Sequence, residues 1–178
     1  MSNARGKGVS GTCASEEMLL EGRKFPADVH KKLKALLQEG NVEAFRREAG
    51  EAYIISGYVV EGNKIGRTLG YPTANLGYAD ASQVQPGQGV YIAMVKVEGR
   101  WFEGMANIGI RPTIDADNVT IEAHLFDFSK DIYGKKISIA LLSRIRDEMR
   151  FNSLSELKVQ LDRDALTAKE LLRNIRWS

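Results

Sequence analysis

The chain has 178 residues, of which 43% are hydrophobic and 27% charged, and its formal net charge is +2. This length and composition suit one globular domain with a sizeable core. The net charge is too small to indicate a surface that binds nucleic acid. The only cysteine is Cys13 and no apolar run reaches the length of a membrane span. We therefore expect a cytoplasmic protein, a monomer, without an internal disulfide and without nucleic-acid or membrane partners.

The first 50 residues are predicted to form a tail and then helices. Residues 1–14 are rich in Gly, Ser and Lys and lack the apolar core of a secretory signal, which favours a disordered tail. Residues 15–50 have helical character. One apolar stripe consists of Val29, Leu33, Leu36 and Leu37. Gly40 suits the end of that helix, and Asn41 suits the cap of a second helix that ends near Gly50.

From Glu51 the chain becomes rich in β-branched and aromatic residues separated by turn signals. The predicted strands are 53–61, 73–76, 89–98, 100–108, 119–128 and 136–145, with a tight hairpin at Glu98-Gly99. Short strands without helices between them favour an antiparallel barrel over a parallel α/β sheet. We therefore divide the chain into a tail with a helical extension, residues 1–50, and a barrel domain, residues 51–178.

The C-terminal region is predicted to be one helix. Ser153-Leu154-Ser155-Glu156 has the spacing of a capping box. Apolar residues then recur at intervals of three and four: Leu154, Leu157, Leu161, Ala165, Ala168, Leu172 and Ile175. This stripe is expected to pack against the barrel, which leaves four charged residues to solvent: Arg163, Asp164, Lys169 and Arg173. The fold class is therefore mainly β, a barrel with helices at both ends.

A glycine-rich basic segment lies between the first two predicted strands. It is not a Walker A loop, because three residues rather than four separate Gly62 from Gly66, and because Pro72 comes too soon for a helix to follow. Phosphates would therefore be held by loop amides and by Lys64 or Arg67. The alternative is an ordinary hairpin loop with exposed cations.

Thr73 and Asn75 follow this segment in the sequence Pro-Thr-Ala-Asn. In an extended segment they point to the same side, which places two neutral oxygen ligands for one hard cation such as Mg²⁺. Metal binding would then depend on the negative charge of a nucleotide. The alternative is a turn and strand start in which Asn75 bonds its own backbone.

Glu122 is the candidate general base. Alternation along 120–128 puts it on one face with His124, Phe126 and Phe128, where a carboxylate is partly removed from water. The alternative is a rim carboxylate paired with a surface lysine. His124 is expected to neighbour the site rather than to bind a metal, because the sequence places no second histidine or cysteine cluster near it.

Two further segments suit ligand contacts. Arg146, Met149 and Phe151 lie between the last strand and the capped helix, where an arginine beside an aromatic ring can hold a planar ligand; the alternative is a hydrophobic staple at the helix entry. The segment 107–113 contains a glycine and a cation and suits a mobile flap. The alternative is that this segment only leads the chain from a strand into a loop.

Seven blocks follow one another along the chain: Gly57–Gly62, Gly66–Leu76, Gly89–Tyr91, Ala106–Thr113, Ile121–Phe128, Asp131–Gly134 and Ile145–Phe151. In this order they resemble the riboflavin kinase family over roughly residues 53–172. The resemblance implies a six-stranded antiparallel Greek-key barrel with a C-terminal helix. It also implies ATP:riboflavin 5′-phosphotransferase activity, which converts riboflavin and ATP to FMN and ADP.

The resemblance also implies roles for single residues. Thr73 and Asn75 would coordinate Mg²⁺, with Mn²⁺ and Zn²⁺ as alternatives, and Glu122 would be the general base on the ribityl 5′-hydroxyl. The ATP phosphate loop would include Gly62, Lys64 and Arg67, with Asp127 and Tyr133 near the nucleotide. The flavin would lie along Arg146, Met149 and Phe151.

One feature of many bacterial relatives is missing from the sequence. They carry an FMN adenylyltransferase domain with a His-x-Gly-His motif, whereas the histidines here are His30 and His124, and neither sits in such a motif. Residues 27–50 resemble at most the tail of that domain, so we do not expect FAD synthesis by this chain. Two other classes stay open: a barrel that binds flavin or nucleotide without catalysis, and an interaction module.

Overall fold

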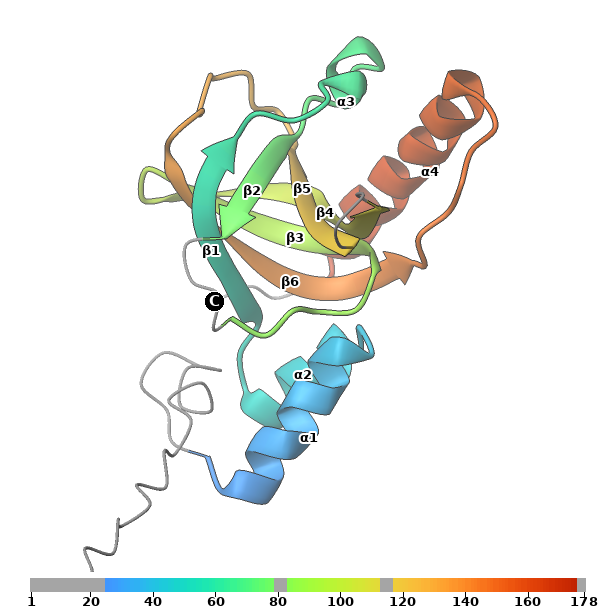
Figure 1. The fold of residues 1–178 in the computed structure, drawn as a ribbon. Helices are drawn as coiled ribbons and strands as arrows, with labels where there is room; N and C mark the ends of the chain where they lie inside the picture. Colours follow the sequence, from blue (N-terminus) through green and yellow to red (C-terminus); the bar gives the residue numbers. More distant parts are fainter. Residues whose placement is uncertain (1–24, 79–82, 113–116, 176–178) are drawn as a thin grey trace, which may run out of the picture.

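The computed structural model describes residues 25–78, 83–112 and 117–175. The strands are β1 (Tyr53–Val60), β2 (Ala74–Tyr78), β3 (Gly89–Val97), β4 (Arg100–Pro112), β5 (Asp117–Leu125) and β6 (Lys136–Arg146). The helices are α1 (Ala27–Gln38), α2 (Val42–Ala49), α3 (Ile65–Thr68) and α4 (Leu154–Leu172). The strands close an antiparallel barrel in the order β1-β2-β5-β4-β3-β6, with β6 paired back to β1 (Figure 1). The predicted barrel is thus confirmed.

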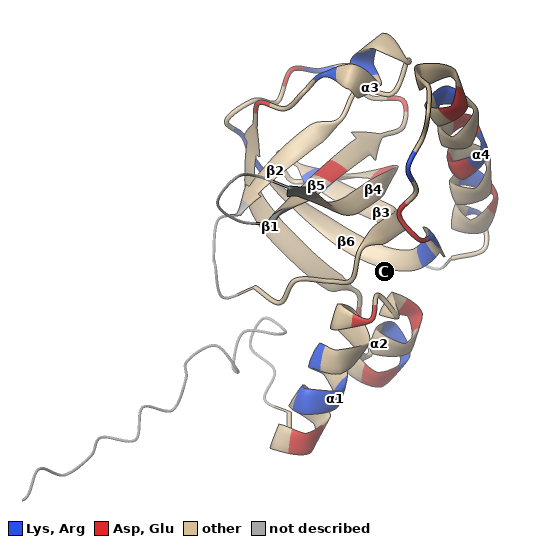
Figure 2. Cartoon of the chain, turned by 45° about the vertical axis from the view of Figure 1, so that its right-hand side comes forward, with Lys and Arg blue, Asp and Glu red and all other residues tan. Residues whose placement is uncertain are grey.

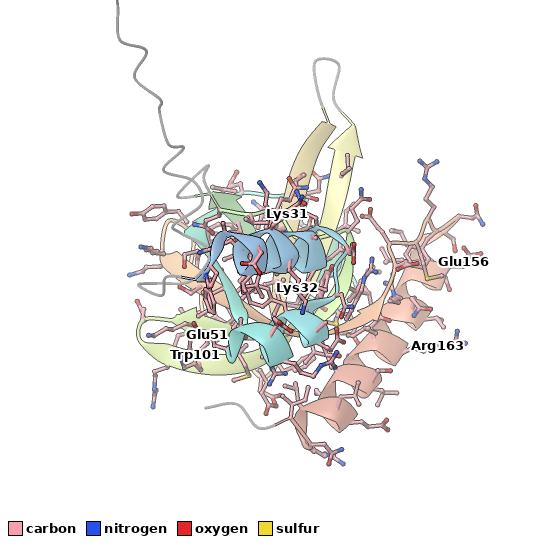
Figure 3. The ribbon with its side chains drawn as sticks, turned by 90° about the horizontal axis from the view of Figure 1, so that it is seen from below. Lys31, Lys32, Glu51, Trp101, Glu156 and Arg163 are labelled. Atoms are coloured by element: carbon pink, nitrogen blue, oxygen red, sulfur yellow. The ribbon has the colours of Figure 1, made fainter. Side chains whose placement is uncertain are left out.

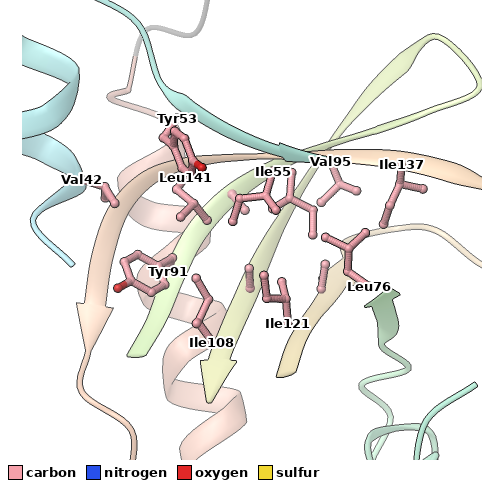
Figure 4. Packing of buried hydrophobic residues seen from close by; sticks show 14 of the residues in the cluster. Val42, Tyr53, Ile55, Leu76, Tyr91, Val95, Ile108, Ile121, Ile137 and Leu141 are labelled. Atoms are coloured by element: carbon pink, nitrogen blue, oxygen red, sulfur yellow. The ribbon is translucent and has the colours of Figure 1, made fainter. Parts of the chain in front are cut away.

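The barrel interior is filled by alternate residues of each strand, as a period of two requires. Figure 4 shows side chains from all around the barrel meeting there, among them Ile55, Val95 and Ile121. The same cluster continues into the two N-terminal helices through Leu33, Leu37, Val42 and Phe45, all fully buried. Helices α1 and α2 therefore close one end of the barrel, as the views from the front and from below both show (Figures 1 and 3).

The predicted helix ends are confirmed at the N-terminal helices. Gly40, directly after the C-cap residue Glu39 of α1, has a φ of 76°, which glycine adopts without strain. The Asn41 side chain caps α2 by accepting a hydrogen bond from the amide of Ala44 at 3.1 Å. Gly50 ends α2 in the left-handed region. The part of the predicted helical region over residues 15–24, and the predicted tail over 1–14, lie outside the described residues.

Helix α4 lies against the outside of the barrel, as predicted (Figure 1). Ser153 Oγ accepts the amide of Glu156 at 3.1 Å, and the Glu156 carboxylate accepts the amide of Asn152 at 2.9 Å. A second apolar cluster joins the helix to β3, β4, β6 and two residues outside the strands, Ala52 and Phe126; its other members are Ile92, Met94, Met105, Ala140, Leu142, Ala165, Ala168 and Leu172. Figure 2 shows acidic and basic residues spread along the helices, whereas the strands are mostly tan.

The predicted exposure of two residues on α4 is wrong. The apolar stripe predicts that Leu154 packs against the barrel, but it is 57% exposed because it opens the helix, away from the barrel. The same pattern predicts that Asp164 faces solvent, but it is 1% exposed because the guanidinium of Arg146 meets its carboxylate there. None of the described helices has the length and hydrophobicity to cross a membrane.

The described part of the segment 107–113 is a strand rather than the predicted loop. Strand β4 continues through Pro112 and pairs with β5 from Gly104↔Leu125 to Pro112↔Asp117, so ladder hydrogen bonds hold this backbone. The Glu98-Gly99 hairpin is confirmed. Both residues have positive φ, 48° and 84°, as a two-residue turn between twisted strands requires.

Two other local predictions are corrected. Alternation predicts Phe128 on the face of Glu122, but β5 ends at Leu125 and Asp127 has a φ of 52°, so Phe128 turns back and packs against the inner cluster beside Phe102. The glycine segment itself contains a helix: α3 makes one turn and stops at Thr68, before Pro72 excludes further helix. This single turn is too short to provide a helix-terminal anion site.

Candidate functional site

A row of register partners crosses five strands on the outer face of the barrel. Asn75 of β2 lies opposite Glu122 of β5, which lies opposite Asn107 of β4. The row continues through Val90 of β3 to Arg146 of β6. Because directly opposed residues in a sheet share a face and lie side by side, the row links the Pro-Thr-Ala-Asn segment to Arg146. Residues far apart in the sequence thus form one surface.

A pocket of about 300 Å³ opens over this row, and we call it the Glu122 pocket. The loop with Lys64 borders it on one side, and Leu157 and Leu161 of α4 border it on the other. Its lining includes six residues singled out in the sequence: Lys64, Thr73, Glu122, Arg146, Met149 and Phe151. With Glu148 also in its lining, the pocket combines two carboxylates and two cations with apolar and aromatic side chains, as a ligand site requires.

A second pocket of about 480 Å³ adjoins the first, and we call it the Tyr133 pocket. Arg67, Phe128 and Tyr133 are among its lining residues. Thr73 lines both pockets, and the ammonium of Lys64 lies 5.8 Å from the centroid of the Tyr133 ring. The two pockets therefore meet at Thr73, with a lysine near the junction.

Thr73 lies at this junction, and Asn75 lies opposite Glu122 of the neighbouring strand. The Thr73 hydroxyl donates to Glu122 Oε2 across 3.4 Å. Asn75 lies against the backbone of Gly62, where an added Cβ would come within 2.1 Å of Asn75 Nδ2 and 2.5 Å of Asn75 Oδ1. Only glycine leaves space for this side chain, so the loop and the amide are built to fit each other.

The donor chemistry of this junction fits a hard divalent cation. The side chains offer a hydroxyl, an amide carbonyl and a nearby carboxylate, which are oxygen ligands of the kind that Mg²⁺ prefers. Within the described ranges, no three His, Cys, Asp or Glu residues gather in a way that could hold a metal ion. A cation at Thr73 and Asn75 would therefore take most of its negative charge from a bound phosphate.

Tyr71 and His124 hold the backbone directly before Thr73. The Tyr71 hydroxyl donates to Asp162 of α4 at 2.6 Å, and its ring packs edge-on against His124 with centroids 5.1 Å apart. His124 Nδ1 lies 2.8 Å from the carbonyl oxygen of Pro72, which can only accept, so Nδ1 carries the proton. The segment is thus anchored to both the barrel and the helix.

The surroundings of these two side chains shift their pKa values. Burial raises the pKa of Tyr71 to about 12, and the hydrogen bond to Asp162 acts in the same direction. Burial lowers the pKa of His124, and the charge of Lys169 adds to this, while the bond to Pro72 opposes it. Both side chains are therefore neutral at pH 7, which suits their roles as hydrogen-bond donors.

Arg146 is held by a carboxylate from α4. Its Nε lies 3.0 Å from both oxygens of Asp164, and its Nη2 lies 2.7 Å from Oδ2. Gln160 donates to the same carboxylate at 2.8 Å. The guanidinium carbon lies 5.9 Å from the centroid of the Phe151 ring, so the arginine plane and the ring border the pocket together.

The structure gathers most of the predicted site residues and separates one. Asn75 lies against Gly62 and opposite Glu122, and Arg67 and Tyr133 line the second pocket. Asp127 lines a different groove, together with Lys158 and Lys169 of α4. His124 lines the Glu122 pocket, as a neighbour of the site would.

Sequence reasoning missed four residues at the site: Tyr71, Asn107, Asp162 and Asp164. The sequence does indicate that Asp164 is buried. It follows the helical spacing of the apolar stripe, at intervals of four, three and four along Leu157, Leu161, Asp164 and Ala168. A charged residue at such a position is expected to have a buried partner. The other three depend on strand register or on the place where α4 crosses the barrel.

Comparisons with known proteins agree with this geometry. Residues 49–172 match the family model described as Flavokinase: Riboflavin kinase. A bifunctional riboflavin kinase/FMN adenylyltransferase from Haemophilus influenzae is 46% identical over 121 residues, which cover 67% of this chain and 39% of that protein. Its counterpart from Bacillus subtilis is 36% identical over 172 residues, which cover 95% of this chain and 53% of that protein.

A solved structure has the same fold over most of the chain. It is a crystal structure described as a macrolide-efflux protein from Streptococcus pneumoniae, with a TM-score of 0.76 and 33% identity, and the match covers 90% of this chain and 50% of that one. This chain thus spans about half the length, or less, of these three proteins. On the family model and these relatives, the chain belongs to the riboflavin kinase family.

Proposed function

We propose that this chain transfers the γ-phosphate of ATP to the 5′-hydroxyl of riboflavin, which gives FMN and ADP. The observation that carries the proposal is the position of Thr73, which lines both pockets and lies 3.4 Å from Glu122. A phosphoryl group can pass between two substrates only where their sites meet. At this meeting point the chain provides a base, oxygen ligands and a cation.

In this proposal riboflavin occupies the Glu122 pocket. The flavin ring is planar and largely apolar, and Met149, Phe151 and Leu157 give the pocket a wall of matching character. Arg146 borders the same wall and offers a flat, charged donor surface. The ribityl chain then extends along the row toward Glu122 and Thr73.

ATP in turn occupies the Tyr133 pocket. Tyr133 and Ile132 offer an aromatic and an apolar surface for a base, and Arg67 offers a charge for phosphates. Lys64 lies between the two pockets, where the transferred group would be. We place the phosphates under the loop that contains Gly62, Lys64 and Arg67. For Asp127, which lines the groove next to α4, we propose only an indirect role.

Each side chain then has one task in the transfer. Glu122 orients the ribityl hydroxyl and accepts its proton as the new O–P bond forms and the bond from the γ-phosphorus to the β–γ bridging oxygen breaks. Lys64, Arg67 and loop amides offset the charge on the phosphate oxygens. Thr73 and Asn75 would hold Mg²⁺, which when bound screens the phosphates and aligns them. The walls formed by α4 and the loop limit access of water to the phosphate.

A coupled assay tests this function. Purified chain with MgATP and riboflavin should yield FMN and ADP in equal amounts, measured by chromatography with flavin fluorescence. Riboflavin binding without any FMN, whichever divalent metal is supplied, would instead identify a binding barrel and sink the proposal. The choice of Mg²⁺ over Mn²⁺ or Zn²⁺ comes from the same assay. The monomeric state, the cytoplasmic location and the boundary at residue 50 stay predictions from the sequence.

A further inference from the structure

Strand β6 is irregular where it leads to Arg146. Its pairing with β3 runs from Val97↔Ile137 to Ala93↔Leu141, and then continues as Ile92↔Ser143, Tyr91↔Arg144 and Val90↔Arg146. Leu142 and Ile145 are therefore extra residues in β6 without an opposite residue in β3. Each such bulge bends a strand and turns the following side chains.

The two bulges decide which arginine joins the row over the Glu122 pocket. In an uninterrupted register, Val90 would lie opposite residue 144. With two extra residues it lies opposite Arg146, while Arg144 lies opposite Tyr91 and places its guanidinium carbon 5.9 Å from that ring's centroid. The pocket arginine, and with it the ion pair to Asp164, thus depends on the bulges.

Two side chains of α2 hold the bulged segment. Glu43 Oε1 accepts the amide of Arg144 at 2.8 Å and also accepts the hydroxyl of Ser143. Arg46 Nη1 donates to the carbonyl oxygen of Leu142 at 3.1 Å. Backbone groups at a bulge lose regular ladder partners, and leaving them unpaired away from water is costly. Glu43 and Arg46 therefore provide hydrogen bonds that the neighbouring strand would provide in a regular sheet.

We infer that Glu43 and Arg46 are positioning residues for riboflavin binding, acting through the β6 bulges on Arg146. Both residues lie before position 49, where the match to the family model begins. In this view α2 is a functional part of the kinase barrel rather than an attached extension. The inference rests on the proposed function, because it assumes that riboflavin lies against Arg146.

The test compares riboflavin binding in three variants of the full chain, by quenching of flavin fluorescence with MgADP present. Glu43→Ala should raise the riboflavin Kd by about tenfold, or roughly 1.4 kcal/mol. Glu43→Gln should restore wild-type binding, because the amide oxygen can still accept both hydrogen bonds. Lys32→Met is the matched control, since it breaks the exposed Lys32–Glu48 pair of the same two helices without touching β6.

A merely structural role predicts a different result. In that case Glu43→Ala would lower the melting temperature but leave the riboflavin Kd of the folded protein unchanged, which would overturn the inference. If Glu43→Ala does not fold, Arg46→Met takes its place, because it keeps the carboxylate and removes one bond to the bulge. An unchanged riboflavin Kd in Arg46→Met would then overturn the inference as well. Failure of the wild-type chain to bind riboflavin would count against the proposed function instead.

Discussion

Arg146 and Asp164 form an ion pair between the end of β6 and the middle of α4, 18 positions apart in the sequence. The Asp164 side chain is 2% exposed and the Arg146 side chain 17% exposed. The pair makes α4 a wall of the Glu122 pocket and gives the guanidinium one orientation. The helix therefore forms part of the proposed ligand site, although the proposed reacting groups lie on the barrel and its loops.

Removal of the Asp164 charge should destabilise the fold and weaken flavin binding together. Breaking one side of a buried pair costs roughly 3–5 kcal/mol, and Asp164→Ala should fall near the lower end because Arg146 keeps some contact with water. Urea denaturation measures this cost. The matched control is Glu170→Gln on the same helix, whose carboxylate is exposed and whose loss should change stability little. Equal destabilisation by the two variants would contradict the buried-pair interpretation.

Loss of the Glu122 charge should stop catalysis without preventing binding. Glu122→Gln keeps the size of the side chain but cannot accept the hydroxyl proton, so kcat should fall by about 10²–10⁴. Riboflavin affinity should stay close to that of the wild type. Glu103→Gln, an exposed carboxyl change on neighbouring β4, serves as the control. A wild-type kcat in Glu122→Gln would remove the general-base role.

Filling the space at Gly62 should disturb the cation site through Asn75. An added Cβ would lie 2.1 Å from that side chain and displace it. Gly62→Ala should therefore raise the Mg²⁺ concentration that half-saturates ATP binding by about 10-fold or more. Thr73→Ala should act in the same direction by removing one ligand. Gly99→Ala is the control. It places a Cβ in open space at a φ of 84°, so it should cost some stability but leave the Mg²⁺ titration unchanged.

The pH dependence of stability should contain a contribution from His124. Because burial lowers its pKa in the folded state below 6.5, this contribution is fully present above pH 6.5 and is lost as pH falls through the folded-state pKa. Between the folded-state pKa and pH 6.5, His124 changes the free energy of unfolding by at most about 1.4 kcal/mol per pH unit. Thermal unfolding of wild type and His124→Gln from pH 8 to pH 5 measures it. Parallel curves for the two proteins would show that His124 contributes nothing.

Much of the architecture is predictable from the sequence because it depends on local patterns. Alternation along Tyr53–Val60 indicates a strand with one buried face, and the turn signal at Glu98-Gly99 indicates the hairpin after β3. The capping residues Asn41 and Ser153 mark helix starts, because a cap acts on amides only two or three residues away. The motif blocks carry the resemblance to riboflavin kinases, and that resemblance predicts that Thr73, Glu122 and Arg146 belong to one site; all three line the Glu122 pocket.

The tertiary structure alone decides which distant groups meet. The burial of Asp164 depends on a guanidinium from β6, and the register of Arg146 depends on two bulges whose backbone is bonded by α2. Phe128 leaves the face of Glu122 because the chain turns at Asp127, which alternation along a strand cannot indicate. Periodicity and capping report interactions within a few residues, whereas these contacts form only after barrel closure brings strands and helices together.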